Sequence, residues 1–465
     1  MKRPTTPATA ASATTSPRAR LPLGRKIAYG LGDWGNTTTS TIFTFFFLYF
    51  LTGVARLPAH LAGLVMLAGG IWDAVNDPLI GVLVDRVRTR WGRRRPFFLF
   101  NALPLAATFT MMWWVPDVGD LGKFAWYAVA FILFDTCFTL MTVPYGAMTA
   151  EMSGDYDERT ELTGWRMGTS MVGGLVAAFF VPQIVRAFGV EGTGYLVAGA
   201  GFGLLAAVPY VVLFFTTRES FAAVERPRTR LLEGFLSTLK NRTFRYAAGV
   251  YLLAWTTVSL VGSLLQYFVT DWLRIPGQLE YILALVQGLA AGFIVLVVFL
   301  SGRLDKRAAY AVSAGSWALV MLGLSALPRT AIPVAYVLAG LAGFGVAGAH
   351  VVPWSMVPDA IEEDEIATGT RREGAFYGMA VCIQKVAAAF TLFLVSLVLG
   401  WAGYRAGVEQ PASALVAIRV LIGVLPALML GASIAVAWKS PMGRDEHRRT
   451  LAEAERRRMA PPGRR

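Results

Sequence analysis

The sequence predicts an all-α membrane protein with twelve transmembrane helices in two six-helix bundles, and three observations predict this class. The 465-residue chain is 55% hydrophobic and only 16% charged, whereas a soluble domain carries about 25% charged residues. Apolar segments recur along the chain, and each is long enough for the roughly 20 residues that cross a bilayer. The longest polar interruption, residues 217–243, leaves six such segments on each side.

The predicted segments follow one another with short polar connections. They lie at residues 27–53, 58–84, 96–115, 123–149, 163–187, 194–216, 244–270, 279–301, 308–327, 331–357, 373–402 and 413–438. The basic loop after the second segment has a counterpart after the eighth, at residues 301–307. The two halves of the chain therefore repeat one another weakly.

Three polar regions complete the predicted organisation. Residues 1–26 are expected to form a cytoplasmic tail. The first 20 residues are rich in Thr, Ala, Ser and Pro and lack an apolar core. This composition is typical of a disordered tail and not of a signal peptide. The central loop, residues 217–243, separates the bundles at 27–216 and 244–438, and its stretch 231–239 has the pattern of a short amphipathic helix on the membrane surface. The basic tail at residues 439–465 contains a second candidate surface helix, residues 448–458.

The placement of the charges predicts the orientation. The net charge is +13, and Lys and Arg gather before the first segment, in residues 85–96, 218–245 and 303–307, and from 439 onward. The other loops carry about one basic residue each, which is the positive-inside pattern of an inner-membrane protein with both termini in the cytoplasm. Because membrane segments separate the basic clusters, we expect no nucleic-acid partner. We expect a monomer in the lipid bilayer that takes a small-molecule solute.

Two aspartates in the second segment are the most informative residues of the chain. Asp73 and Asp77 are four residues apart, so both lie on one face of a helix. A charge at bilayer depth costs several kcal/mol unless it is paired or hydrated, and two like charges also repel each other. The pair therefore favours a bound cation or proton between them. The alternative is a helix end solvated by a loop, which applies more to Asp77 than to Asp73.

Five short motifs carry a resemblance to a known family. They are Tyr-Gly-Leu-Gly-Asp-Trp-Gly-Asn at 29–36, Trp-Asp-Ala-Val-Asn-Asp-Pro at 72–78, Arg-Trp-Gly-Arg-Arg-Arg-Pro at 90–96, Val-Pro-Tyr-Gly-Ala at 143–147, and Asp-Glu-Arg-Thr at 157–160 followed by Arg166. In this order and spacing, from about residue 22 to 440, the chain resembles the glycoside–pentoside–hexuronide:cation symporters. The resemblance implies the major facilitator fold, with a solute site at the midplane between the halves.

The resemblance also implies a cation site. Asp73 and Asp77 match the family's ligands for the coupling ion, Na⁺ or H⁺, and they would hold the metal if the ion is sodium; no other cofactor is expected. Thr139 matches a hydroxyl beside that ion, with helix packing as the alternative role. Lys385 matches a lysine that reaches the same site, and its alternative is a side chain that extends to the membrane surface.

For the solute, the resemblance points to Arg166, whose guanidinium suits hydroxyls or a carboxylate. Its alternative is an anchor paired with Glu158 or Glu161. Thr37 and Thr142 replace two sugar-binding aspartates of the family's galactoside carrier, which makes galactosides doubtful as the solute. Tyr145, in the motif at 143–147, completes this part of the expected solute site.

Two more side chains are candidates for the solute cavity. Asp135 is seven residues before Thr142, so it shares that helix face; a hydrogen bond between helices is its alternative role. His350 stands where an aromatic residue is expected, and its alternative is a packed core histidine. The basic side chains Arg93, Arg94 and Arg95 are expected to form an inner gate with acidic partners that include Asp359 and Glu362.

Three functions follow as hypotheses. The favoured one is cation-coupled symport of a glycoside, pentoside or hexuronide by alternating access. The second keeps the mechanism but carries a lysolipid or another amphiphile, since lysolipid symporters also resemble this family. The third, an integral-membrane enzyme, needs a nucleophile–base or metal cluster. The three histidines are scattered at 60, 350 and 447, so the sequence does not predict an enzyme.

Overall fold

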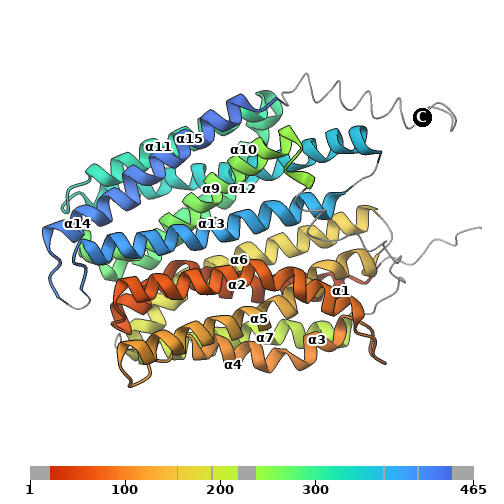
Figure 1. Ribbon diagram of the computed structural model, residues 1–465, viewed down its shortest axis with the longest axis horizontal. Helices are drawn as coiled ribbons and strands as arrows, with labels where there is room; N and C mark the ends of the chain where they lie inside the picture. The colour runs from red at the N-terminus through yellow and green to blue at the C-terminus, as the bar shows by residue number, and fades with distance from the viewer. Residues whose placement is uncertain are drawn as a thin grey trace, which may run out of the picture.

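The computed structural model consists of long helices and short connections (Figure 1), and it describes residues 21–153, 156–189, 192–217, 237–369, 372–405 and 408–441. The expected tail at residues 1–20 and the candidate helix at 448–458 lie outside these residues. So does most of the candidate helix at 231–239.

The first half of the chain contains six rods, a name we use for one long helix or for a run of consecutive helical segments. The first is α1 (Leu23–Ile42), which continues through two π-helical segments, η1 (Phe43–Phe47) and η2 (Phe50–Val54). The third rod is broken at Asn101, whose amide donates a hydrogen bond of 2.6 Å to the main-chain oxygen of Cys137. The remaining helices of this half are α2 (Ala59–Arg86), α3 (Arg95–Phe100), α4 (Ala102–Met111), α5 (Asp120–Met152), α6 (Tyr156–Phe188) and α7 (Thr193–Thr216).

The second half repeats this pattern. Its first rod, α9 (Arg242–Tyr267), also ends in a π-helical segment, η3 (Phe268–Trp272). The last rod is built from α14 (Ala412–Arg419), η5 (Val420–Val424) and α15 (Leu425–Lys439). Between them come η4 (Pro276–Gln278), α10 (Leu279–Arg303), α11 (Lys306–Ala326), α12 (Ile332–Thr368) and α13 (Glu373–Trp401).

Ten helices among the described residues are long and apolar enough to cross a membrane. The first rod, Leu23 to Val54, and the broken third rod, α3 with α4, complete the predicted set of twelve. The ends of most rods lie near the predicted boundaries, but α6 begins seven residues before the predicted 163 and α12 continues eleven residues beyond the predicted 357. The last turns of α12 are charged, so the hydropathy pattern does not include them. Hydropathy predicts the length of a helix within the bilayer and not its full length.

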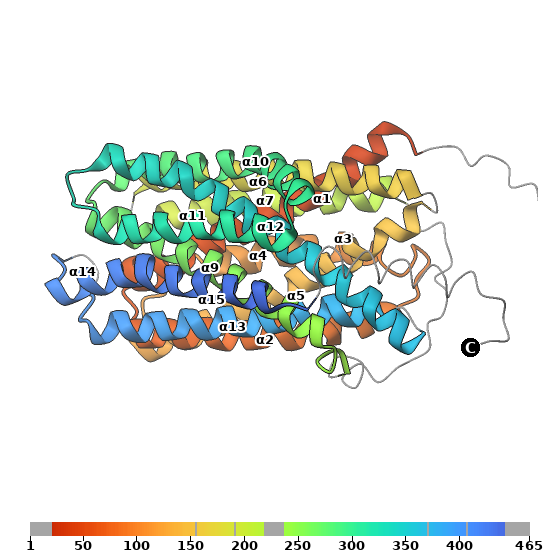
Figure 2. The same ribbon diagram turned by 90° about the horizontal axis from the view of Figure 1, so that it is seen from above.

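The helices of the two halves form two layers (Figure 1). Helices α1 to α7 occupy the lower layer of that view and α9 to α15 the upper layer, and α1 begins at the same end of the molecule at which α15 ends. The layers meet where α2 packs against α13 and α6 against α10, and Figure 2 shows α2 beside α13. Small residues permit this approach: Gly70 of α2 lies against Ala389 of α13. A larger side chain at position 70 would collide with Ala389.

Candidate ion and solute sites

The four residues predicted for the cation lie together where α2, α5 and α13 meet. The Lys385 ammonium nitrogen is 2.6 Å from Oδ1 of Asp73 and 2.7 Å from Oδ2 of Asp77. The Thr139 hydroxyl donates a hydrogen bond of 3.1 Å to the other Asp77 oxygen. Lys385 therefore crosses the seam between the halves, and it does not extend to the membrane surface.

Geometry and charge explain this cluster. Asp73 and Asp77 share a face of α2, as their spacing predicts, and their side chains are 23% and 35% exposed. One ammonium between two carboxylates offsets their mutual repulsion and gives each a charge-assisted hydrogen bond. The site can therefore hold a single positive charge between two helices of different halves. Its partial exposure leaves room for an ion to arrive from water.

Asp135 lies beside the ion cluster and not in the central cavity. It is only 5% exposed, and the amide of Asn76 donates to its Oδ2 at 3.1 Å and to its main-chain oxygen at 3.3 Å. It also interacts with Asp73. The structure thus favours the alternative role for Asp135, a hydrogen bond between helices α2 and α5.

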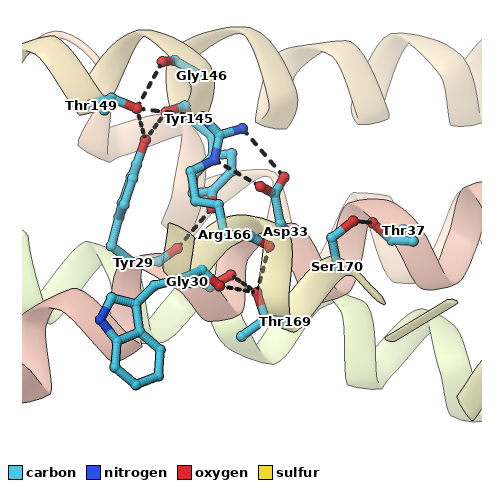
Figure 3. A network of polar contacts seen from close by, with 11 residues as sticks. Tyr29, Gly30, Asp33, Thr37, Tyr145, Gly146, Thr149, Arg166, Thr169 and Ser170 are labelled. Atoms are coloured by element: carbon cyan, nitrogen blue, oxygen red, sulfur yellow. Dashed lines mark hydrogen bonds and ion pairs between the residues drawn. The ribbon is translucent and has the colours of Figure 1, made fainter. Parts of the chain in front are cut away.

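Arg166 forms the centre of a second polar network, between α1, α5 and α6 (Figure 3). Its Nε donates to Oδ2 of Asp33 at 2.7 Å, and its guanidinium lies over the ring of Tyr145 at 4.7 Å. Tyr145 and Tyr29 hold this arrangement, since each hydroxyl donates to the main-chain oxygen of the other residue. In this conformation Arg166 is committed to a carboxylate that is 3% exposed.

Asp33 was missed as a site residue, although its motif was recognised. A carboxylate inside an apolar segment, as for Asp73, was the feature that could have found it. The alternative partners of Arg166 are engaged elsewhere. Lys26 lies 2.5 Å from Glu161 and 3.5 Å from Glu158, and this ties the start of α1 to the start of α6.

A cavity of about 410 Å³ lies between the halves, and its two ends differ in polarity. At one end is a polar rim, which we define as Asn36, Thr37, Ser170, Gln287 and His350. The other end lies within the second half and is an apolar limb, which we define by Leu273, Ile282, Met321, Leu324, Ala335 and Ala339. The described residues that line the cavity include no Lys, Arg, Asp or Glu.

Two of the predicted solute residues, Thr37 and His350, belong to the polar rim. The Thr37 hydroxyl lies 2.5 Å from that of Ser170 (Figure 3). Nδ1 of His350 is 2.8 Å from the main-chain oxygen of Val346, so Nδ1 carries a hydrogen, and the ring centroid is 4.7 Å from that of Trp255. Thr142, Tyr145, Arg166 and Asp135 lie outside the lining of this cavity.

Two of the predicted gate residues, Arg95 and Asp359, each have a partner within their own half. The Arg95 guanidinium donates to the main-chain oxygen of Phe214, with Nε at 3.0 Å. Asp359 is bridged by Lys306, 2.8 Å away on α11. Arg94 is buried, while Arg93 and Glu362 are half-buried near the same end of the molecule. A gate that joins these residues across the halves stays a prediction.

At the opposite end, polar contacts close the seam. The Tyr267 hydroxyl of α9 donates to the main-chain oxygen of Leu48 at 3.0 Å and lies 2.5 Å from the Thr52 hydroxyl of η2. Arg186 of α6 forms an ion pair with Glu280 of α10. Sequence reasoning missed this closure, because hydroxyls and single charges near segment ends are common and do not reveal their partners.

Comparison with known proteins gives the same class. Residues 28–444 match the family model described as MFS/sugar transport protein, MFS being the major facilitator superfamily. The uncharacterized symporter sll1374 of Synechocystis sp. is 33% identical, over 92% of this chain and 96% of that protein. The putative glycoside/cation symporter YagG of Escherichia coli is 30% identical, with coverages of 88% and 90%.

Two further matches widen the comparison. The sodium-dependent lysophosphatidylcholine symporter 1-A of Danio rerio is 26% identical, over 92% of this chain and 87% of that protein. The crystal structure of the nucleoside transporter NupG has a TM-score of 0.63 at 12% identity, with coverages of 93% and 99%, which shows the shared fold.

The fold and the matches define a secondary transporter of the membrane, and not an enzyme. The chain belongs to the MFS/sugar transport family, a family of major facilitator transporters that includes glycoside–cation symporters.

Proposed function

We propose that the protein is a cation-coupled symporter of a neutral glycoside that works by alternating access. The observation that carries the proposal is Lys385, which places its ammonium between Asp73 and Asp77. In the proposed cycle, Na⁺ or H⁺ takes the place of this ammonium. The two carboxylates and the Thr139 hydroxyl then supply the oxygen ligands that a hard cation prefers.

The polar rim supports a neutral glycoside as the solute. Its hydroxyl, amide and imidazole groups can donate to and accept from sugar hydroxyls. The side chain of Trp255, whose ring lies next to that of His350, also lines the cavity. A hexuronide or a phosphate needs a paired charge when it is buried. The described lining offers none, and YagG, a relative, carries the name of a glycoside/cation symporter.

A lysolipid or other amphiphile is the second candidate. The apolar limb favours it, and so does the similarity to the lysophosphatidylcholine symporter of Danio rerio. The neutral rim argues against a zwitterionic phosphate head. We therefore retain this candidate as an alternative outcome of the uptake experiment.

The proposed orientation places both termini in the cytoplasm of a cell whose inner membrane holds the protein. The end at which α1 begins and α15 ends is then the inner end. The contacts of Tyr267 and of the Arg186–Glu280 pair close the seam at the outer end. The conformation described here is accordingly closed toward the outside.

Uptake into liposomes tests the proposal. Purified protein is reconstituted, and accumulation of labelled methyl glycosides is measured under an imposed Na⁺ or pH gradient, with lysophosphatidylcholine in parallel. We expect Asp73→Asn and Asp77→Asn to abolish accumulation, because each change removes a charged ligand of the ion. Exchange of solute without a gradient should survive at least in part.

Asp117→Asn, in an exposed loop, serves as the matched control and should accumulate solute normally. Wild-type accumulation by both Asp73→Asn and Asp77→Asn would contradict the ion site. Accumulation of lysophosphatidylcholine alone would replace the glycoside by the second candidate.

A further inference from the structure

The apolar limb of the cavity is lined by residues of the second half of the molecule. Helix α12 lines the cavity from Ala335 to His350, with contributions at Ala339, Ala342 and Val346. These residues are three or four apart, so they form one face of the helix. The 15 residues between the two ends correspond to about 22 Å at 1.5 Å per residue.

The side chains at the far end of this path are apolar and buried. Leu273 is 4% exposed, Leu324 is 7% and Ala335 is 2%. The side chains of the six residues that define the limb carry no hydrogen-bonding group, whereas the hydroxyls of Ser40, Thr41 and Thr44 and the indole N–H of Trp317 line other parts of the cavity. A cavity without polar partners does not hold water well, whereas it favours an apolar ligand group.

The near end of the path has the opposite chemistry. Thr37 and Ser170 from the first half face Gln287 and His350 from the second half. The Gln287 amide nitrogen approaches the same part of α6 as the Thr37 side chain, near Gly174. A ligand that fills both ends must therefore be neutral and rich in hydroxyls at one end and apolar at the other.

We propose that the transported solute is an amphiphilic glycoside, whose sugar binds at the polar rim and whose alkyl or aryl group occupies the apolar limb. This inference rests on the proposed symport of a neutral glycoside and narrows its substrate class. It excludes a phosphate-bearing head, because no charged side chain of the described lining can pair with it. It also assigns Ala339 and Ala335, two small residues on α12, as the residues that leave space for the apolar group.

The chain length of the ligand provides the test. Methyl, butyl and octyl forms of glucosides, galactosides and xylosides compete for gradient-driven uptake in liposomes, below the concentrations at which octyl glycosides form micelles. Because each buried methylene contributes a fixed transfer free energy, affinity should rise about fourfold per added methylene. Wild-type affinity that is independent of chain length would overturn the inference.

A substitution that fills the limb separates this effect from general detergent action. Ala339→Phe should abolish the gain from butyl to octyl and leave the affinity for the methyl glycoside within about twofold. Val337→Phe, which adds similar bulk at a position that is 61% exposed on the same helix, should retain the gain. Retention of the gain by Ala339→Phe would show that the apolar group binds elsewhere.

Failure of this inference differs from failure of the proposed function. If methyl glycosides accumulate but chain length has no effect on affinity, the symporter proposal stands and the proposal of an amphiphilic glycoside is wrong. If lysophosphatidylcholine accumulates and octyl glycosides do not compete with it, the proposal that the solute has a neutral sugar head group is wrong. If no glycoside of any length accumulates or competes under either gradient, both proposals are wrong.

Discussion

Arg166 and Asp33 form a pair whose loss should be costly to the folded protein. Asp33 is 3% exposed, so removal of the guanidinium leaves a buried carboxylate without its ion partner. Breaking such a pair typically costs 3–5 kcal/mol, whereas replacing both partners costs much less. We therefore expect Arg166→Gln to lower the thermal stability of the purified protein strongly, and Arg166→Gln with Asp33→Asn to recover most of it.

The uptake of methyl glycosides by the double variant gives a second measurement. Arg166 lies outside the lining of the cavity, so we expect uptake to return together with stability. Stability that returns without uptake would indicate that Arg166 contacts the solute in another conformation, as the family resemblance implies. If Arg166→Gln alone is as stable as the wild type, the pair does not stabilise the fold.

At the scale of elements, a group of polar contacts ties the beginnings of α1 and α6 together. The Leu21 N–H donates to Glu158 at 2.6 Å, and the Lys26 ammonium lies 3.5 Å from the same carboxylate. Burial opposes ionisation of Glu158, but hydrogen bonds from Ser153 and Leu21 and the charge of Lys26 outweigh it and lower the pKa of Glu158. The hydrogen bond with Glu161, opposed by burial, raises the pKa of Lys26.

These directions predict a pH dependence. A carboxyl group whose pKa is lowered by folding stabilises the protein above its ordinary pKa of about 4.5, and this contribution disappears as the pH falls through the lowered value. Wild-type protein should thus be more stable than Glu158→Gln at pH 7, and the difference should vanish in acid. Thermal unfolding in detergent across this pH range measures the difference. A constant difference at all pH values would assign the effect to packing.

At the scale of the whole molecule, Tyr267 holds together the end of the seam that the proposed orientation places outside. Tyr267→Phe keeps the ring but removes the hydroxyl that joins α9 to Leu48 and Thr52. The loss of about 1 kcal/mol corresponds to a roughly fivefold shift toward the outward-open form. A cysteine at Ser40, in the cavity wall, should then react faster with a membrane-impermeant maleimide added outside, in a background without Cys137 and Cys382.

Tyr310→Phe offers the matched control for this experiment. Tyr310 is buried and pairs with Ser433 inside the second half, away from the seam. Removal of the Tyr310 hydroxyl should therefore leave the labelling rate of Ser40→Cys unchanged. If Ser40→Cys reacts at the same rate with and without Tyr267→Phe, other contacts hold this end of the seam closed.

The sequence predicted the twelve rods well, because bilayer thickness fixes the length of each apolar segment. It also placed Asp73, Asp77, Thr139 and Lys385 in one group, because spacing pairs the two aspartates and the family resemblance adds Thr139 and Lys385. It did not predict that Asp135 would pair with Asn76, or that Arg166 would pair with Asp33. Periodicity assigns a residue to a helix face, but the neighbour of that face depends on how the helices pack.

The same limit explains the solute site. Thr37 and His350 were predicted and line the cavity, while the apolar limb was not foreseen. Its residues, such as Leu324 and Ala339, have the composition of any membrane helix. Only the space left between η3, α10, α11 and α12 distinguishes them from ordinary packing residues.

The bridge from Lys385 to α2 has a consequence for the energetics of the empty carrier. A lysine that is tethered next to Asp73 and Asp77 acts as a built-in competitor, and its effective concentration is in the millimolar range or above. In the proposed cycle an incoming cation displaces this resident charge, and the displacement removes a polar contact between α13 and α2. Under that proposal, ion loading and the loss of this contact across the seam are a single event.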